Sequence, residues 1–202
     1  TSRTTGGTTD SYQWDAEGEL ASDDDYQYVY DANGTRIVRD GTDGTTVYLP
    51  GGQELTITGT AVSAARYYTF GGQTIATRTS KGLSGVTSLV TDRDGSVVAA
   101  VPNTTWTTSS LKRVYSDPFG AVRGSTDAGV PGDHRFLGAP RDAASGLTLL
   151  GARYYDPVAG CFISVDPVLN VEVPAHLNAY VYGFNNPASF SDPSGLEPKD
   201  KN

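Results

Sequence analysis

The sequence predicts an all-β protein built from successive β-hairpins. Its 202 residues include 24 glycines, 11 prolines and 12 tyrosines, a composition rich in turn formers and in a residue that favours strands. A unit of the form aromatic-x-aromatic-Asp-x-x-Gly recurs along the chain, and no long segment follows the period of a helix. We therefore expect a continuous antiparallel sheet that curls or stacks, with each hairpin burying its aromatic face on the next.

The clearest copies of this unit lie at residues 12–20 and 28–37. In each copy the alternating aromatic residues lie on one face of a strand, Asp-x-x-Gly reverses the chain, and an apolar residue begins the returning strand. Degenerate copies with the same strand-turn-strand pattern follow at 46–57, 66–76, 86–99 and 114–122. Recurrence at such a spacing is typical of repeat architectures, and because open sheet edges invite pairing we expect neighbouring repeats in a longer protein.

The pattern changes near residue 131. Short aromatic strands then alternate with proline and glycine, and we expect strands at 135–138, 147–157 and 160–167. Residues 175–184 are the one segment in which we expect a helical turn or two. A charged tail closes the sequence at 197–202.

Charge and composition exclude several classes of site. The balance of 15 Lys and Arg against 23 Asp and Glu leaves a net charge of −8, so we expect no nucleic-acid partner, because phosphate binding needs a basic face. Cys161 is the single cysteine, which excludes an internal disulfide and a cysteine-based metal cluster. With only His134 and His176 as histidines, a His-rich metal site is hard to build, and we expect neither a metal nor a cofactor.

Membrane and calcium sites are equally poorly supported. No window approaches the roughly 20 apolar residues that a membrane-spanning helix needs, so we expect no membrane span. The acidic turns at 40–44 and 92–95 lack the spacing and the closing Glu of an EF-hand loop, and we interpret them as turns. The sequence contains no methionine, from which we expect a processed or excised segment of a longer protein.

A more specific pattern occupies the C-terminal third. Its motifs are RFLG at 135–138, GARYYDP at 151–157, GCFISVDP at 160–167, NAY at 178–180, NNP at 185–187 and DPSGL at 192–196. In order and spacing this succession resembles the core segment associated with Rhs (rearrangement hotspot) repeats, and the aromatic-Asp-x-x-Gly units are similar to the YD repeat of the same family. The resemblance spans 12–196. It departs from the family at Cys161, where the usual residue is Arg.

The resemblance implies a fold and an activity. Members of the family coil YD repeats into a hollow β-shell that encloses a C-terminal polypeptide, often a toxin, and the core segment is an aspartic autopeptidase that cuts after the Leu of D-P-x-G-L. On that mapping residues 1–130 are repeats, 131–196 are the core, and 197–202 begin the variable cargo, with the scissile bond between Leu196 and Glu197. The implied partners are the protein's own cargo, upstream repeats, and secretion-system or toxin-complex components, and the implied location is secreted or at the cell surface.

The family motifs nominate Asp166 and Asp192 as the catalytic carboxylates and Arg153 as their partner. Two carboxylates that share one proton can activate water and polarise a carbonyl. Arg153 would orient a carboxylate, keep it ionised, or stabilise an oxyanion. Taken as residues alone, each Asp-Pro is an ordinary turn opener, and Arg153 fits an ion pair with Asp156 equally well. We interpret Asp117 and Asp156 as structural.

Two alternatives stay open. Cys161 and His176 would form a thiol dyad, although a lone cysteine in a strand is more often a small buried hydrophobe. An intein-like acyl shift fails at this bond, because Glu197 offers no hydroxyl or thiol. The rival to the single-turnover peptidase is an uncleaved structural element of a surface protein or extracellular fibre, in which aromatic rows serve self-association or glycan contact.

Overall fold

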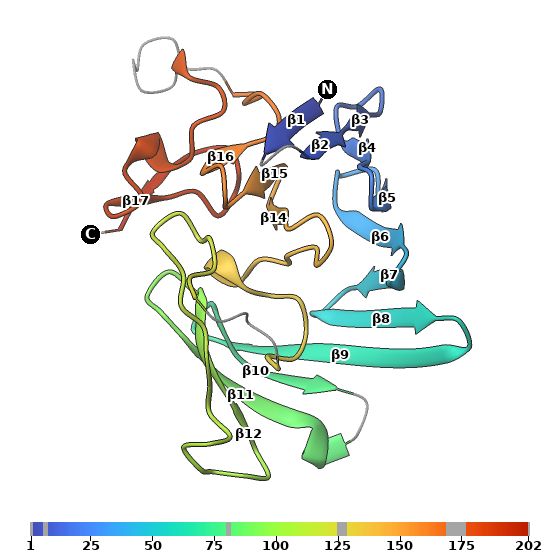
Figure 1. Ribbon diagram of the computed structural model, residues 1–202, viewed down its shortest axis with the longest axis vertical. Helices are drawn as coiled ribbons and strands as arrows, with labels where there is room; N and C mark the ends of the chain where they lie inside the picture. Colours follow the sequence, from blue (N-terminus) through green and yellow to red (C-terminus); the bar gives the residue numbers. More distant parts are fainter. Residues whose placement is uncertain (1, 6–7, 80–81, 125–128, 169–176, 202) are drawn as a thin grey trace. The chain divides into compact units, whose positions relative to one another are not determined.

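The computed structural model describes residues 2–5, 8–79, 82–124, 129–168 and 177–201. The chain divides into two compact units, Thr1–Tyr67 and Tyr68–Asn202, which we call unit 1 and unit 2. Throughout the described ranges the regular elements are β-strands and short 3₁₀ turns, which confirms the all-β prediction (Figure 1). These ranges contain no helix long and apolar enough to cross a membrane.

Unit 1 consists of antiparallel hairpins taken in chain order. A first hairpin pairs β1 (Ser2–Thr5) with β2 (Thr8–Ser11). A second sheet then runs through β3 (Gln13–Trp14), β4 (Leu20–Ser22), β5 (Tyr26–Tyr30), β6 (Arg36–Gly41), β7 (Gly44–Leu49), β8 (Gln53–Thr58) and β9 (Ala61–Phe70), each bonded to the next. The strand β9 carries the chain into unit 2. The expected succession of hairpins is therefore present.

The Asp-x-x-Gly turns share one hydrogen-bond pattern. In each, the Asp Oδ1 atom accepts the backbone N–H groups two and four residues later, at 2.8 to 3.1 Å. The four aspartates that do so are Asp15, Asp31, Asp92 and Asp117. The glycine three residues on has a positive φ of 76° to 90° in all four turns, a conformation that is cheap only for glycine. The repeat motif is thus an aspartate-closed turn.

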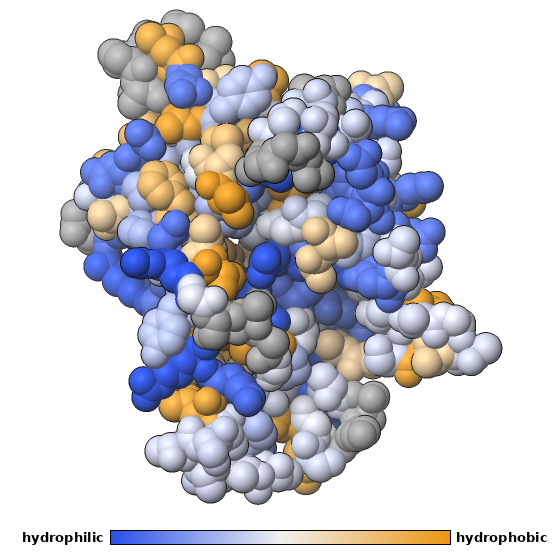
Figure 2. All heavy atoms as spheres, in the orientation of Figure 1, coloured by the Kyte–Doolittle hydropathy of each residue, from blue (hydrophilic) through white to orange (hydrophobic). Residues whose placement is uncertain are grey.

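The aromatic face of unit 1 packs against arginine. The guanidinium of Arg36 lies 4.4 Å from the ring centroid of Tyr48, and that of Arg39 lies 4.7 Å from the ring of Tyr26. Both arginines are buried, because their planar groups stack on the rings. Aromatic packing between hairpins therefore includes arginine, since both arginines lie on β6 and cover a ring on a neighbouring strand, Tyr26 on β5 and Tyr48 on β7. Apolar side chains such as Val29 remain exposed, and residues of this kind are orange in Figure 2.

Unit 2 continues the pattern and adds two small sheets. Next to β9 lie β10 (Gln73–Thr79), β11 (Val86–Thr91), β12 (Val97–Pro102) and β13 (Lys112–Arg113). The first small sheet consists of β14 (Thr148–Leu150), β15 (Arg153–Asp156) and β16 (Cys161–Phe162). The other pairs β17 (Phe190–Ser191) with β18 (Lys199–Asp200). Its 3₁₀ turns are η1 (Gly82–Gly85), η2 (Phe136–Gly138) and η4 (Gly183–Asn185). A core of Leu150, Tyr155, Phe162 and Tyr182 joins the β14–β15–β16 sheet to the C-terminal loops.

Some local expectations are wrong. Residues 136–138 of the expected strand 135–138 form the 3₁₀ turn η2, in which Leu137 has a φ of 54°. The expected strand 147–157 is the hairpin of β14 and β15, because the chain turns at Gly151. Residues 175–176 lie outside the described ranges, and the rest of the expected helical segment is turns that end in η4. There Phe184 and Asn185 adopt positive φ, which a right-handed helix does not allow. The division into 1–130, 131–196 and 197–202 rests on the resemblance and stays a prediction.

Candidate functional site

The β14–β15 hairpin places Arg153 at the start of β15. Leu150 pairs with Arg153 across the hairpin, and between them Gly151 turns at a φ of 52°. The Ala152 N–H donates to the Ser194 carbonyl at 2.9 Å, which ties this turn to the segment before the predicted cut. The Arg153 guanidinium lies 3.7 Å from the centroid of the Phe162 ring in β16. The arginine is therefore fixed by its hairpin and by an aromatic face.

Arg153 binds both predicted carboxylates through one nitrogen. Its Nη2 atom lies 2.8 Å from Asp166 Oδ2 and 3.6 Å from Asp192 Oδ2. Its other nitrogens donate to backbone carbonyls, Nη1 to Ala179 at 3.0 Å and Nε to Gly195. Burial lowers the pKa of Arg153, and the charges of Asp166 and Asp192 act in the opposite direction. The guanidinium thus joins three loops and neutralises part of the charge of two carboxylates.

The two carboxylates differ in their access to water. The Asp166 side chain is 14% exposed, whereas that of Asp192 is 0% exposed. Asp166 Oδ1 accepts the Val168 N–H at 2.8 Å, and its own N–H donates to the Ala179 carbonyl at 3.0 Å. The structure therefore brings Asp166, Asp192 and Arg153 together, with Asp166 on the solvent side.

Asp192 closes a turn over the predicted cleavage site. Its Oδ1 atom accepts the Ser194 hydroxyl at 3.0 Å and the N–H groups of Leu196 and Glu197, each at 3.2 Å. The Glu197 nitrogen is the nitrogen of the Leu196–Glu197 peptide bond. Among the described residues, Asp192 Oδ2 has no hydrogen-bond partner and faces Arg153. One oxygen of Asp192 thus contacts the bond in question and the other contacts the arginine.

Two residues of this turn were not predicted as part of the site. Ser194 bonds to Asp192, and its hydroxyl also accepts the Leu196 and Glu197 N–H groups at 3.3 and 3.4 Å. Gly195 turns at a φ of 66° and offers its carbonyl to Arg153. The signal that would have found them is the spacing Asp-x-x-Gly, which 192–195 share with the repeat turns.

Cys161, Asp117 and Asp156 belong to segments other than the Asp192 turn. Cys161 is half-buried in β16, opposite Asp156, and His176 lies outside the described residues. Asp117 and Asp156 close turns, Asp156 by accepting the Val158 N–H at 2.9 Å. These contacts support the structural interpretation of both aspartates.

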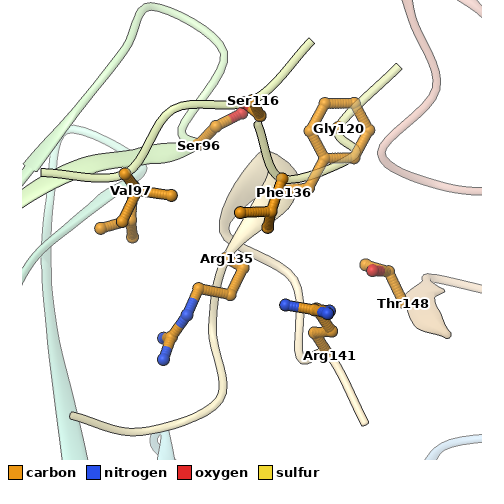
Figure 3. A pocket seen from close by; sticks show the side chains of 10 residues that line it. Ser96, Val97, Ser116, Gly120, Arg135, Phe136, Arg141 and Thr148 are labelled. Atoms are coloured by element: carbon orange, nitrogen blue, oxygen red, sulfur yellow. The ribbon is translucent and has the colours of Figure 1, made fainter. Parts of the chain in front are cut away.

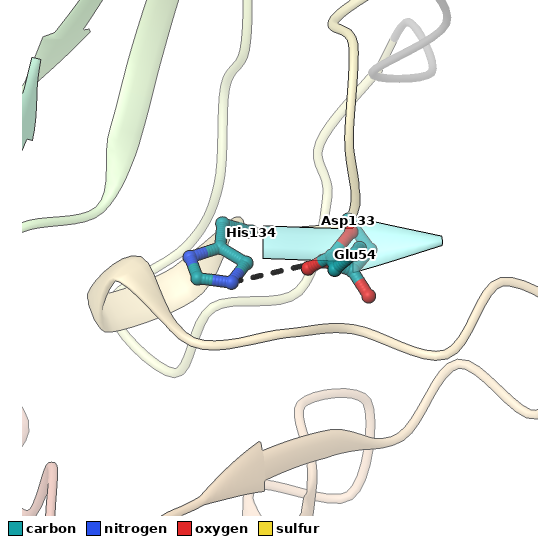
Figure 4. Close-up of side chains that lie close together, drawn as sticks. All are labelled: Glu54, Asp133 and His134. Atoms are coloured by element: carbon teal, nitrogen blue, oxygen red, sulfur yellow. Dashed lines mark ion pairs between the residues drawn. The ribbon is translucent and has the colours of Figure 1, made fainter. Parts of the chain in front are cut away.

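Two other polar features of unit 2 are separate from Arg153. His134 Nε2 lies 3.8 Å from Asp133 Oδ1, a local pair drawn dashed in Figure 4. A small pocket between β12 and the loop before β14 is lined partly by Arg135, Arg141 and Thr148 (Figure 3). It contains none of the three predicted site residues.

The chain is similar in sequence to nucleases and to a toxin subunit, although no family model matches it. It is 29% identical over 205 residues to the tRNA3(Ser)-specific nuclease WapA of Bacillus spizizenii, covering 92% of this chain and 8% of that protein. It is 44% identical over 66 residues to the toxin subunit YenC2 of Yersinia entomophaga, covering 33% of this chain and 6% of YenC2. A probable deoxyribonuclease RhsA of Dickeya dadantii is 41% identical over 61 residues, which are 30% of this chain and 4% of RhsA.

Solved toxin complexes have the same fold. TcdB2-TccC3 without its hypervariable C-terminal region superposes with a TM-score of 0.72 at 23% identity, over 93% of this chain and 10% of that chain. The Tc holotoxin pore of Photorhabdus luminescens, with the mutation TccC3-D651A, superposes with a TM-score of 0.70 at 24% identity, over 94% of this chain and 10% of that chain.

The fold is a β-repeat fold of the kind seen in these solved complexes. These relatives and solved structures are consistent with the resemblance to Rhs/YD-repeat proteins that the motifs predict. The chain spans less than a tenth of the length of the curated relatives.

Proposed function

We propose that the chain is the C-terminal part of an Rhs shell and cleaves its own backbone once, between Leu196 and Glu197. The observation that carries this proposal is the Asp192 carboxylate, which bonds to the nitrogen of that peptide and faces Arg153 together with Asp166. Burying a carboxylate costs free energy of folding. The burial of Asp192 beside the Glu197 nitrogen therefore indicates that the fold requires this carboxylate there. The geometry supports an aspartic mechanism that needs no cofactor.

The division of labour follows from exposure. Asp166 is the carboxylate nearer solvent, so it takes the proton from the attacking water, whose oxygen bonds to the Leu196 carbonyl carbon. Asp192 Oδ1 accepts the Glu197 N–H before the reaction. Once the shared proton of the pair is on Asp192, Asp192 passes it to the Glu197 nitrogen as the carbon–nitrogen bond breaks. The pair therefore begins with one shared proton on Asp192 and ends with it on Asp166, as in other carboxylate dyads.

Arg153 holds this arrangement together. Its bonds to the Gly195 and Ala179 carbonyls fix the backbone on both sides of the carboxylates, and its charge offsets the negative charge that develops on the Leu196 oxygen. Phe162 keeps the guanidinium plane in place. The arginine is thus both a clamp and an electrostatic stabiliser.

The wider role follows from the relatives. Tc toxin complexes share the fold, and a toxin subunit and a nuclease are similar in sequence to this chain. We therefore propose that residues 1–130 form part of a shell, that 131–196 form its autoproteolytic core, and that 197–202 begin an enclosed toxin or effector. Its partners would be that cargo, further repeats of the shell, and toxin-complex or secretion-system components. The assembly would be secreted or lie at the cell surface.

The test is the intact mass of the native full-length protein. We expect a fragment that ends at Leu196, and we expect Asp166→Asn and Asp192→Asn to leave the chain whole. Asp117→Asn is the matched control, since Asp117 closes a similar turn away from Arg153 and should not affect cleavage. An uncleaved wild-type chain would contradict the proposed peptidase activity. It would support the alternative, in which the chain is an uncleaved structural element of a surface protein or fibre.

A further inference from the structure

The segment that follows the proposed cut is bound to unit 2 as a strand. β18 pairs with β17, with Lys199 opposite Ser191 and Asp200 opposite Phe190. The Lys201 N–H extends the ladder by donating to the Ser189 carbonyl at 2.9 Å. The backbone downstream of Leu196 therefore bonds to the strand immediately before Asp192.

An ion pair fastens the far end of this segment. Lys201 Nζ lies 2.6 Å from Asp94 Oδ2, and the two side chains are only 15% and 21% exposed. Asp94 belongs to the turn between β11 and β12, whose backbone is fixed by Asp92. Partial burial limits the screening that weakens ion pairs in open solvent. Lys199, on the same strand, is exposed and forms no ion pair among the described residues.

We propose that residues 197–201 occupy a docking site for the new amino terminus of the cleaved product, so that cleavage cuts the chain without releasing its downstream part. This inference rests on the proposed cleavage. Retention here comes from bonds to β17 and Asp94, and it does not depend on enclosure by a shell. It makes release a separate step from hydrolysis.

Cleavage itself strengthens one of these bonds. Hydrolysis adds the water hydroxyl to the Leu196 carbonyl carbon and turns the Glu197 nitrogen into a free amine, which binds a proton at neutral pH. That nitrogen lies 3.2 Å from Asp192 Oδ1. The donor to the Asp192 carboxylate thereby changes from a neutral amide to an ammonium, so that an ion pair adds to the hydrogen bond.

The experiment compares denaturing and native mass spectra of the cleaved full-length protein. We expect two masses under denaturing conditions and one complex under native conditions. Lys201→Ala and Asp94→Asn should each speed dissociation of the downstream part at least tenfold, and the double variant should add little to either. Lys199→Ala is the matched control and should dissociate as the wild type does. Equal dissociation of Lys201→Ala and wild type would overturn the docking site.

A second measurement separates this inference from the proposed function. In the Asp166→Asn chain, which we expect to stay intact, hydrogen exchange at the Lys201 amide should be protected, and Lys201→Ala should reduce the protection at least fivefold. Exchange at the rate of an unstructured chain would refute docking even if cleavage occurs. A wild-type chain that never cleaves would instead refute the peptidase and leave this protection unchanged.

Discussion

Asp192 Oδ1 lies 3.2 Å from the backbone nitrogen of Glu197, the far side of the peptide bond that follows Leu196. In the four repeat turns the equivalent aspartates bind the N–H groups two and four residues later, and each closes a local loop. At Asp192 the bond to the N–H four residues later is kept, with Leu196 as donor, and a bond from the Glu197 N–H, five residues later, takes the place of the one two residues later. The proposed site is therefore a variant of the turn that the repeats use.

Ser194 explains the difference between the two kinds of turn. Asp117-Pro118-Phe119-Gly120 and Asp192-Pro193-Ser194-Gly195 differ only at the third position. The Phe119 N–H bonds to Asp117, whereas the Ser194 hydroxyl bonds to Asp192 and to the two amides beyond it. The hydroxyl leaves Asp192 Oδ1 directed at the Glu197 nitrogen.

We therefore predict that Ser194→Ala slows self-cleavage by about 10-fold to 150-fold while the chain stays folded, since a lost hydrogen bond to a charged group costs about 1.5–3 kcal/mol. Ser194→Thr keeps the hydroxyl and should restore most of the rate. The measurement is the half-time of cleavage after refolding, followed by mass. A merely structural role for Ser194 would lower the melting temperature in Ser194→Ala without changing that half-time.

Arg153 gives a prediction about stability. Arg153→Met leaves Asp166 and Asp192 facing each other without their cation, and removing one partner of a buried ion pair costs about 3–5 kcal/mol. We expect the free energy of unfolding of the native full-length protein to fall by about that amount in urea titrations. Arg113→Met, on the exposed edge strand β13, should change it by less than about 0.5 kcal/mol. Equal effects of the two variants would contradict the clamp.

Local pattern in the sequence predicts the hairpins well, because each Asp-x-x-Gly turn is closed within five residues of chain. The family motifs predict the three site residues Arg153, Asp166 and Asp192. Their proximity depends on three loops, which only the folded chain brings together. The Ala179 carbonyl, which binds Arg153, has no sequence signal, because every residue carries a carbonyl.

Two of the wrong expectations have a common cause. Leu137 and Phe184 both take positive φ although they are apolar residues in segments that resemble a strand and a helix. The Leu137 N–H bonds to the Ser96 hydroxyl, 41 residues earlier, so a tertiary contact helps to hold this backbone. Propensity and periodicity contain no information about such contacts.

Alkaline pH should destabilise unit 2. Burial raises the pKa of Tyr182, and burial followed by the proximity of Tyr182 raises the pKa of Tyr155. The folded state holds these protons more tightly than the unfolded chain, so the stabilisation is complete below about pH 10 and is lost as the pH rises above it. Tyr182→Phe removes one such group, and we expect its stability to fall less steeply with pH than that of the wild type.

The alkaline prediction is checked by urea titrations between about pH 9 and pH 11. Tyr180→Phe is the control, because it removes the hydroxyl of an exposed tyrosine. An identical slope for wild type and Tyr182→Phe would show that the Tyr182 phenol does not titrate with unfolding.

The last prediction concerns Gly195, where a side chain would cost free energy in two ways, through the positive φ and through a steric clash. Its φ of 66° disfavours any side chain, and a Cβ atom would meet the Leu150 carbonyl and lie 3.0 Å from the Arg153 nitrogen. Gly71 has a φ of 59° with open space around it, so Gly71→Ala should cost only the conformational term of about 1–2 kcal/mol. Gly195→Ala must also displace the β14–β15 hairpin, so we expect a clearly larger loss in the free energy of unfolding together with loss of cleavage. Similar losses for the two variants would mean that the hairpin and the Asp192 turn yield easily, and that Arg153 is not held by their contact.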